Sequence, residues 1–327
     1  MNVAMVEMPA WEIERNIVVR GEEDTNPDYG KSPGERVLQE YIRYGILVLD
    51  KQAGPTSHEV TAWVKKLLKV ERAGHSGTLD PKVTGVLPIC LEESTKIVQA
   101  LLYAGKKYIC VMRTHKNVDK EEIVDVLKLF EGEIYQRPPV RASVKRRLRT
   151  RRIYDIEYLE GDGRNWLFEV ACQSGTYIRK LCHDVGEVLG TGAHMQELRR
   201  NRSGPFLEEE SKDLYDLSEA LEYGDSDKLR ELIDPMERGL ELIPKIWIRD
   251  SAVEAICTGA KLAVPGILRL ESKIKPGDLV GVMTLKGEAV ALMNAEMGWE
   301  EILVSDHGIA ASPERVLMPR GTYPKMW

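Results

Sequence analysis

Strand-like and helix-like patterns alternate along this chain, and their order constrains the fold more than any other feature. Apolar residues alternate over 166–172, as in a strand with one buried face. The chain turns at Gly175, and apolar residues then recur with helical spacing until Gly190. Similar patterns predict a strand over 45–50, a helix after the capping pair Thr56 and Glu59, and a helix over 119–130. Because no regular βαβ repeat is present, the sequence predicts an α+β fold with a mostly antiparallel mixed sheet.

A single carboxylate, Asp80, lies in a loop over 74–88 that is crowded with Gly and Pro. Glycine lets the backbone approach a ligand closely, and Pro81 stiffens the turn after the acid. The apolar run over 86–91 predicts a buried element that anchors the loop. An Asp-Pro pair by itself is most often an ordinary surface turn, so the identity of this loop depends on the segments around it.

Composition excludes several classes of protein. No apolar run is long enough to span a bilayer, and the acidic N-terminal segment is not typical of a signal peptide. The five cysteines are scattered without a CxxC pair, which predicts free, mostly buried thiols in a reducing compartment. They are Cys90, Cys110, Cys172, Cys182 and Cys257. His58, His115 and His194 lack metal-ligand spacing, so no metal site is expected.

The net charge of −6 is unusual for a protein that binds nucleic acid, but the charge is unevenly distributed. Residues 141–202 hold thirteen Lys and Arg against eight Asp and Glu, whereas residues 207–241 hold four against thirteen. Phosphate contacts need such a local basic cluster, whatever the total charge. A basic run of this kind also occurs on an ordinary solvent-exposed face, so the cluster by itself leaves both explanations open. We expect the acidic stretch to face away from RNA, where a protein partner could use it.

The Asp80 loop and six further segments resemble the TruB/dyskerin family of RNA pseudouridine synthases. The segments occupy 45–51, 54–58, 74–88, 106–108, 137–145, 175–179 and 192–200, in the order in which the family has them. The resemblance covers roughly residues 45 to 206, and separate motifs in the right order are a specific signal. It implies a catalytic domain, placed over 45–245, that isomerises uridine in RNA to pseudouridine.

Pseudouridine formation breaks the bond between ribose C1′ and uracil N1, and the base then rejoins through C5. The product is an isomer, so the reaction needs a carboxylate and a pocket for a flipped base, and no cofactor. By the resemblance, Asp80 attacks or deprotonates the sugar, and the planar fork of Arg179 keeps it ionised. Tyr108 would supply an aromatic face for the extruded uracil. Taken alone, such an Arg is usually solvated and such a Tyr usually packs in the core.

The resemblance also implies residues that bind RNA or support the pocket. They are His75, Lys51, Lys145, Tyr177, Leu198, Arg146 and Arg147. The histidine would fill the space that the flipped base leaves, and the leucine would line the pocket. The two lysines look like supports near the pocket or the RNA backbone, and the two arginines belong to the basic cluster. For the tyrosine, packing in the core is the favoured explanation.

The remaining residues resemble two further parts of the family. Short strands separated by Gly and Pro over 246–327 resemble a PUA domain, which is an RNA-binding pseudo-barrel. Residues 1–44 resemble the N-terminal extension of the dyskerin branch, and we expect this extension to pack on the PUA domain. Partial alternation over 11–20 predicts a strand in the extension.

The extension and the last ten residues resemble the dyskerin branch, which works inside an H/ACA guide-RNA particle. This resemblance implies a guide RNA and target ribosomal RNA as RNA partners, with tRNA as an alternative target. It also implies three protein partners, which are a small zinc-binding Nop protein, a Gar protein and a kink-turn-binding ribosomal-type protein. Because the lysine-rich tail of eukaryotic members is missing, we expect an archaeal-type, cytoplasmic protein without a membrane partner.

Two other functions fit parts of the sequence. A noncatalytic RNA-binding scaffold could keep the fold, but it would not need Asp80, Tyr108 and Arg179 together. An Asp-nucleophile phosphohydrolase that uses Mg²⁺ would match the spacing of Asp225 and Asp227, although no apolar strand precedes them. Magnesium dependence of the chemical step would distinguish this second function.

Overall fold

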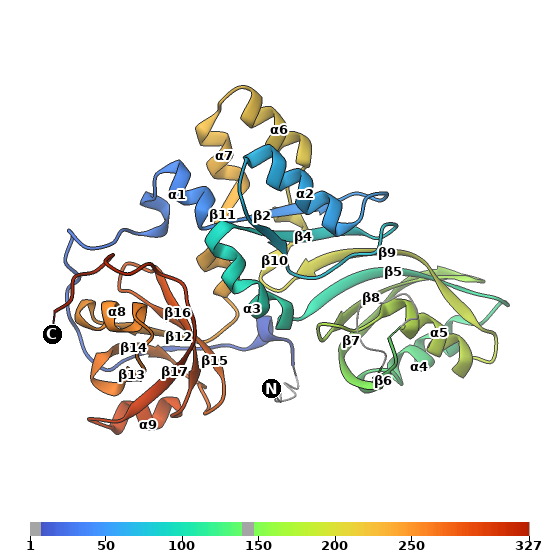
Figure 1. Ribbon diagram of the computed structural model, residues 1–327. Helices are drawn as coiled ribbons and strands as arrows, with labels where there is room; N and C mark the ends of the chain where they lie inside the picture. The colour runs from blue at the N-terminus through green and yellow to red at the C-terminus, as the bar shows by residue number, and fades with distance from the viewer. Residues whose placement is uncertain (1–7, 139–146, 327) are drawn as a thin grey trace.

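The computed structural model describes residues 8–138 and 147–326, which contain a ten-stranded and a seven-stranded β-sheet (Figure 1). The ten-stranded sheet contains, in spatial order, β11 (Ile233–Pro235), β2 (Gly45–Lys51), β4 (Thr84–Leu91), β9 (Ala193–Ser203), β5 (Lys106–Thr114), β8 (Asn165–Cys172), β7 (Arg149–Asp162) and β6 (Gly132–Gln136). The short strand β3 (Ala73–His75) pairs with β4, and β10 (Phe206–Leu207) pairs with β9. Within the described part of this sheet only β4 and β9 pair in parallel, which confirms the predicted α+β fold.

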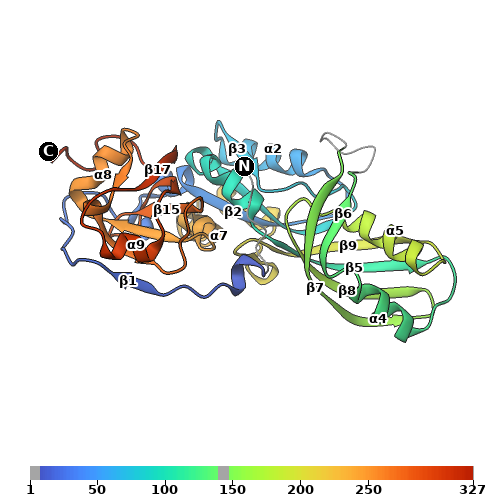
Figure 2. The ribbon, with the colours of Figure 1, turned by 90° about the horizontal axis from the view of Figure 1, so that it is seen from below.

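Two groups of helices cover different parts of this sheet (Figure 1). Helices α2 (Ser57–Leu68), α6 (Leu214–Glu222) and α7 (Ser226–Leu232) share an apolar core with β2 and β4. Helices α4 (Lys120–Lys128) and α5 (Ile178–Val188) share another core with β5, β7 and β8, and Figure 2 shows them along that end of the sheet. The shorter helices are α1 (Leu38–Arg43) and α3 (Val98–Tyr103), with 3₁₀ turns η2 (Pro33–Glu35), η3 (Glu92–Ile97), η4 (Glu208–Glu210) and η5 (Met236–Leu240).

Local sequence signals define the start of α2 as predicted. The Glu59 amide donates to the Thr56 hydroxyl (3.1 Å), and the Thr56 amide donates to the Glu59 carboxylate (2.7 Å). This reciprocal capping satisfies N–H groups that the helix itself leaves without a partner. The predicted helix over 119–130 is also present, although α4 ends two residues earlier, at Lys128.

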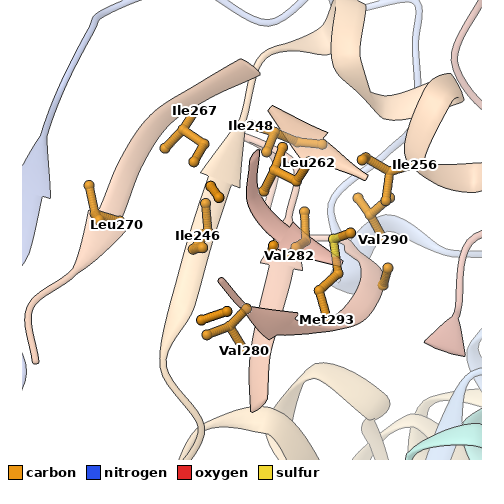
Figure 3. Packing of buried hydrophobic residues seen from close by; sticks show 14 of the residues in the cluster. Ile246, Ile248, Ile256, Leu262, Ile267, Leu270, Val280, Val282, Val290 and Met293 are labelled. Carbon is orange, nitrogen blue, oxygen red and sulfur yellow. The ribbon is translucent and has the colours of Figure 1, made fainter. Parts of the chain in front are cut away.

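The seven-stranded sheet curls around a second core. In spatial order it contains β1 (Ile17–Val19), β14 (Ile267–Glu271), β12 (Lys245–Ile248), β15 (Leu279–Met283), β16 (Ala289–Ala295), β17 (Ile309–Val316) and β13 (Leu262–Ala263). Helices α8 (Asp250–Cys257) and α9 (Trp299–Val304) and the 3₁₀ turn η6 (Val264–Gly266) complete this part. Figure 3 shows Ile246, Val282 and Met293 among the fully buried side chains that fill its interior. This arrangement confirms the predicted C-terminal β-rich pseudo-barrel.

The N-terminal segment contacts both sheets. Trp11 lies in a 3₁₀ turn, η1 (Ala10–Glu12), where the Arg202 guanidinium of β9 lies 4.5 Å from the centre of its ring. Further along, β1 pairs antiparallel with β14, and Val18 lies opposite Leu270. The predicted strand over 11–20 is therefore wrong in its extent, because Trp11 packs on the ten-stranded sheet and only Ile17–Val19 pair with the other sheet.

The two sheets also share an apolar core of their own. Ile46 and Phe206 from the first sheet pack in one cluster with Met283, Leu292 and Leu317 from the second part. Such a shared core limits relative motion, because separating the parts would expose buried apolar surface to water. Within residues 8–138 and 147–326, no helix has the length and apolarity that crossing a membrane requires.

Candidate active site

The Asp80 loop connects β3 to β4 and is tied to the fold through its main chain. The Ser57 hydroxyl, at the start of α2, accepts a hydrogen bond from the Leu79 amide (2.8 Å) and donates one to the Leu79 carbonyl (3.1 Å). At the start of β4, Gly85 has φ +104°, and a Cβ there would lie 2.2 Å from the Arg200 carbonyl oxygen. Only glycine therefore fits where β4 and β9 meet.

Lys51 lies beneath this loop. Its side chain is buried, and its ammonium donates to the carbonyls of Val83 (2.9 Å), Pro81 (3.2 Å) and Gln52 (2.9 Å). Burial lowers the pKa of Lys51, and the nearby Arg200 lowers it further. The structure therefore places Lys51 beneath the Asp80 loop, and its role beside the pocket or the RNA backbone stays a prediction.

Arg179 forms an ion pair with Asp80, from Nη2 to Oδ2. The two side chains are 50% and 51% exposed, so the carboxylate is paired and still accessible to a substrate. Arg179 lies in the first turn of α5, a helix that the apolar core beneath it holds in place. The structure thus brings together the carboxylate that is predicted to act on the sugar and the arginine that is predicted to pair with it.

Tyr108 lies in β5, opposite Arg200 of β9. Burial raises the pKa of its phenol, while the charge of Arg200 and a hydrogen bond from its guanidinium lower it. The Arg200 side chain is itself buried and also donates to the carbonyls of Val86 (2.7 Å) and Gly77 (3.2 Å). Arg200 therefore connects Tyr108 with both sides of the Asp80 loop.

Sequence reasoning did not single out Arg200 as a site residue. It follows Arg199 within the motif over 192–200, and the two arginines look equivalent in the sequence. In the structure, Arg199 binds both carboxylate oxygens of Asp50 at 3.0 Å, whereas Arg200 turns into the interior. The one sequence signal that could have distinguished the two arginines is strand alternation, because neighbouring residues of a strand point to opposite faces of the sheet.

Lys106 is a second buried lysine beside the site. It is 3% exposed, and its ammonium donates to the Leu101 carbonyl (2.9 Å). Burial, together with the charge of Arg200, lowers the pKa of Lys106 to about 7. A lysine with this pKa destabilises the folded protein at every pH below the ordinary lysine pKa, because the unfolded chain then binds the proton more tightly.

Lys106→Met should therefore raise the free energy of unfolding, by an amount that depends on pH. The unfolded lysine keeps its ordinary pKa, so wild type loses stability as the pH falls from about 10 to about 7, at up to roughly 1.4 kcal/mol per pH unit. The variant lacks the buried amine and does not lose this stability. The difference in free energy of unfolding between the variant and wild type should therefore grow as the pH falls over the same interval. Urea unfolding at several pH values measures it, with the exposed Lys65→Met as control. A difference that does not change with pH would contradict a buried amine.

His75 lies at the end of β3, with its ring edge against His58 at 4.8 Å between centres. Among the described residues, neither of its buried ring nitrogens has a hydrogen-bond partner. Burial lowers the pKa of His75 to about 4, and the charges of His58 and Arg200 act in the same direction. The imidazole is consequently neutral near pH 7, with both nitrogens free for a polar ligand.

The other predicted residues lie at different depths. Leu198 is half-buried in β9, opposite Cys110, and packs against the core beneath α5. Tyr177 is half-buried at the N-cap of α5, and Arg147 is exposed just before β7. Lys145 and Arg146 lie outside the described residues.

Two other predictions concern the chemistry of cysteine and aspartate. All five cysteines are free and buried, as predicted. Within the described ranges, no group of three or more His, Cys, Asp or Glu side chains is arranged to hold a metal ion. Asp225 caps α7 by accepting a hydrogen bond from the Lys228 amide (2.9 Å), so helix capping accounts for the acid that suggested a phosphohydrolase.

The fold is that of an RNA pseudouridine synthase with a C-terminal pseudo-barrel. Four family models match successive parts of the chain. They are a DKCLD (NUC011) domain over 10–61, the N-terminal domain of the TruB family pseudouridylate synthases over 65–178, the C-terminal domain of tRNA pseudouridylate synthase B over 179–241, and a PUA domain over 244–317. The chain belongs to the TruB family of pseudouridylate synthases.

Similar proteins match this chain over almost the whole length of both sequences. A probable tRNA pseudouridine synthase B of Methanopyrus kandleri is 57% identical over 96% of this chain and 94% of its own length. The corresponding protein of Pyrococcus furiosus is 53% identical over 98% of this chain and 96% of its own. A solved Cbf5-Nop10-Gar1 complex contains a chain that is 52% identical, with a TM-score of 0.93 over 98% of this chain and 99% of that one. A chain in an H/ACA RNP bound to a substrate RNA containing 2′-deoxyuridine is 51% identical, with a TM-score of 0.91 over 97% and 99% of the two chains.

Proposed function

We propose that this protein isomerises specific uridines of ribosomal RNA to pseudouridine, as the catalytic subunit of an H/ACA guide particle. The observation that carries the proposal is the accessible Asp80–Arg179 ion pair, which lies in a fold whose solved relatives include a substrate-bound H/ACA particle. A noncatalytic scaffold would gain nothing from an exposed carboxylate that pairs with an arginine. Conversion of a tRNA uridine without a guide is a second candidate activity, because the similar archaeal proteins are named tRNA pseudouridine synthases.

In the proposed mechanism, Asp80 acts on the sugar of a uridine that has left its base stack. The carboxylate attacks C1′ or removes a sugar proton, and the bond from C1′ to N1 breaks. The uracil turns and C5 bonds to C1′, which displaces the carboxylate in the first route and takes back the sugar proton in the second. C5 then loses its proton, and N1 takes one up from solvent. Arg179 keeps Asp80 ionised, and Tyr108 supplies a face for the uracil. Asp80 is restored at the end of either route, and the proton lost from C5 is matched by the one gained at N1, so the chemistry balances without a co-reactant.

The surrounding residues have supporting roles in this proposal. His75, which is neutral and has two free ring nitrogens, takes the space of the flipped base. Leu198 and Tyr177 line the pocket from β9 and the start of α5. Arg147, with Lys145 and Arg146 before it, contacts phosphates. Lys51 supports the loop from below.

We propose a division of labour among three parts of the chain. Residues 45–245 form the catalytic domain, residues 246–327 form a PUA domain that holds the guide RNA, and residues 1–44 form an extension that packs on the PUA domain. The pairing of β1 with β14 supports the role of the extension. The Nop and Gar partners are proposed from the solved complex named above, and the kink-turn-binding protein is proposed from family resemblance. A cytoplasmic location follows from the same archaeal-type assignment.

Guide dependence is the central test of this proposal. We expect efficient isomerisation of a ribosomal RNA fragment only when a matching guide RNA and the partner proteins are present. Base pairing would select the uridine, while this chain contacts the backbone and the flipped base. Tritium release from RNA labelled at uridine C5 gives the rate. Raising the salt from about 50 to about 200 mM should weaken assembly, because phosphate contacts release counterions.

A guide RNA whose pairing arms do not match the target is the appropriate control. It assembles the same proteins, and it should yield no release from the ribosomal fragment. Efficient, site-specific conversion of that fragment without any guide would show a stand-alone enzyme. Release from a free tRNA T-loop substrate would instead support the second candidate activity.

A further inference from the structure

Helix α5, which carries Arg179 in its first turn, begins without a capping side chain of its own. Tyr177 occupies the N-cap position, and its side chain makes no capping hydrogen bond. Ser, Thr, Asp or Asn usually supplies that bond at the start of a helix. The sequence of α5 therefore does not by itself define where this helix begins.

Gln136, the last residue of β6, holds the start of α5 from across the fold. Its amide nitrogen donates to the Tyr177 carbonyl (3.1 Å), and its amide oxygen accepts from the Tyr177 N–H (2.9 Å). Gln136 is 2% exposed, so water does not compete for these bonds. A reciprocal pair fixes both the position and the orientation of the main chain, as one rung of an antiparallel ladder does.

The rest of the fold holds Gln136 and α5 in different ways. β6 pairs with β7, where Gln136 lies opposite Arg149. The body of α5 is held by apolar contacts through Ile178, Leu181 and Cys182. Apolar contacts are non-directional, so they leave rotation and sliding of the helix less restricted than hydrogen bonds do. The amide pair acts two residues before Arg179, where a small shift would move the guanidinium.

We propose that Gln136 is a positioning residue, which sets the start of α5 so that Arg179 meets Asp80. The inference rests on the catalytic roles proposed above for Arg179 and Asp80. A misplacement of about 1 Å between reacting groups can cost on the order of 10²-fold in rate. Because Gln136 is buried, its loss should slow the reaction while leaving the affinity for RNA unchanged.

Gln136→Met tests this inference in the complete guided complex. Methionine has nearly the same length and removes both hydrogen bonds. We expect single-turnover isomerisation to slow about tenfold, with the dissociation constant for RNA within about twofold of wild type. Gln173→Met is the matched control, because that glutamine accepts from the Arg152 amide (3.2 Å) instead of holding Tyr177. If Gln136→Met does not fold, Gln136→Glu, which keeps the acceptor and loses the donor, takes its place.

A double-mutant cycle with Arg179→Lys separates positioning from a general loss of structure. If Gln136 acts through Arg179, Gln136→Met should slow the Arg179→Lys protein much less than it slows wild type. Equal slowing in both backgrounds, an unchanged rate in Gln136→Met, or the same loss in Gln173→Met would overturn the inference. Isomerisation at the wild-type rate by Asp80→Asn would overturn the proposed catalytic assignment instead.

Discussion

Asp80→Asn is expected to abolish isomerisation, with a rate at least roughly 10⁴-fold below that of wild type. The amide is nearly the same size as the carboxylate, but it cannot attack or deprotonate the sugar. The loop is held through its main chain by Lys51 and Ser57, so it should keep its shape in the variant. Tritium release in the guided complex measures the rate, and filter binding measures RNA affinity, which should stay within about twofold of wild type.

Asp119→Asn is a matched control for this substitution. Asp119 is exposed at the N-cap of α4, and its side chain makes no capping hydrogen bond. The control therefore removes the same charge from the protein without touching the site, and its rate should be normal. Isomerisation near the wild-type rate in Asp80→Asn would sink the assignment of Asp80.

Arg179→Ala is expected to have the next largest effect, a loss on the order of 10²- to 10³-fold in rate. The alanine variant leaves Asp80 without the cation that pairs with it. Arg179→Lys should recover only part of the rate, since an ammonium lacks the planar fork of a guanidinium. The pair is half exposed, so its loss should change the free energy of unfolding by no more than about 1 kcal/mol.

Lys180→Ala provides the control for Arg179. Lys180 is the next residue of α5 and pairs with Asp184 on the same helix. Its removal deletes one positive charge beside the site and leaves the pair with Asp80 intact. Two results would speak against a specific Asp80–Arg179 interaction: equal losses for both alanine variants, or full activity in Arg179→Lys.

Three buried cations surround the loop that carries the exposed carboxylate. Lys51 and Arg200 donate to main-chain carbonyls of this loop, whereas Lys106 donates to the Leu101 carbonyl of α3. Burying a charge is costly, and groups in such environments concentrate at functional sites. Their arrangement suggests that these charges keep the Asp80 loop rigid at a cost in folding free energy. The pH dependence predicted for Lys106→Met measures that cost for one of them.

Local sequence signals were sufficient for much of the secondary structure. The capping pair Thr56 and Glu59 starts α2 because both bonds form within one turn of the chain. Alternation over 166–172 predicts β8 because one face of that strand is buried. The signal over 11–20 was misleading, because the packing of Trp11 on the ten-stranded sheet replaces strand pairing there.

By itself, the sequence determined the class of fold, the β-rich C-terminal part and the candidates Asp80, Tyr108 and Arg179. The class of fold depends on short-range periodicity, and the three candidates depend on the ordered motifs through which the chain resembles the family. The chain carries both kinds of signal before it folds. Only the tertiary structure decided that Arg179 pairs with Asp80 and that Arg200, unlike its neighbour Arg199, turns inward. It also decided that Gln136 holds the start of α5. Such contacts join residues far apart in the chain, and burial and sheet register, which are properties of the whole fold, determine which side chains meet.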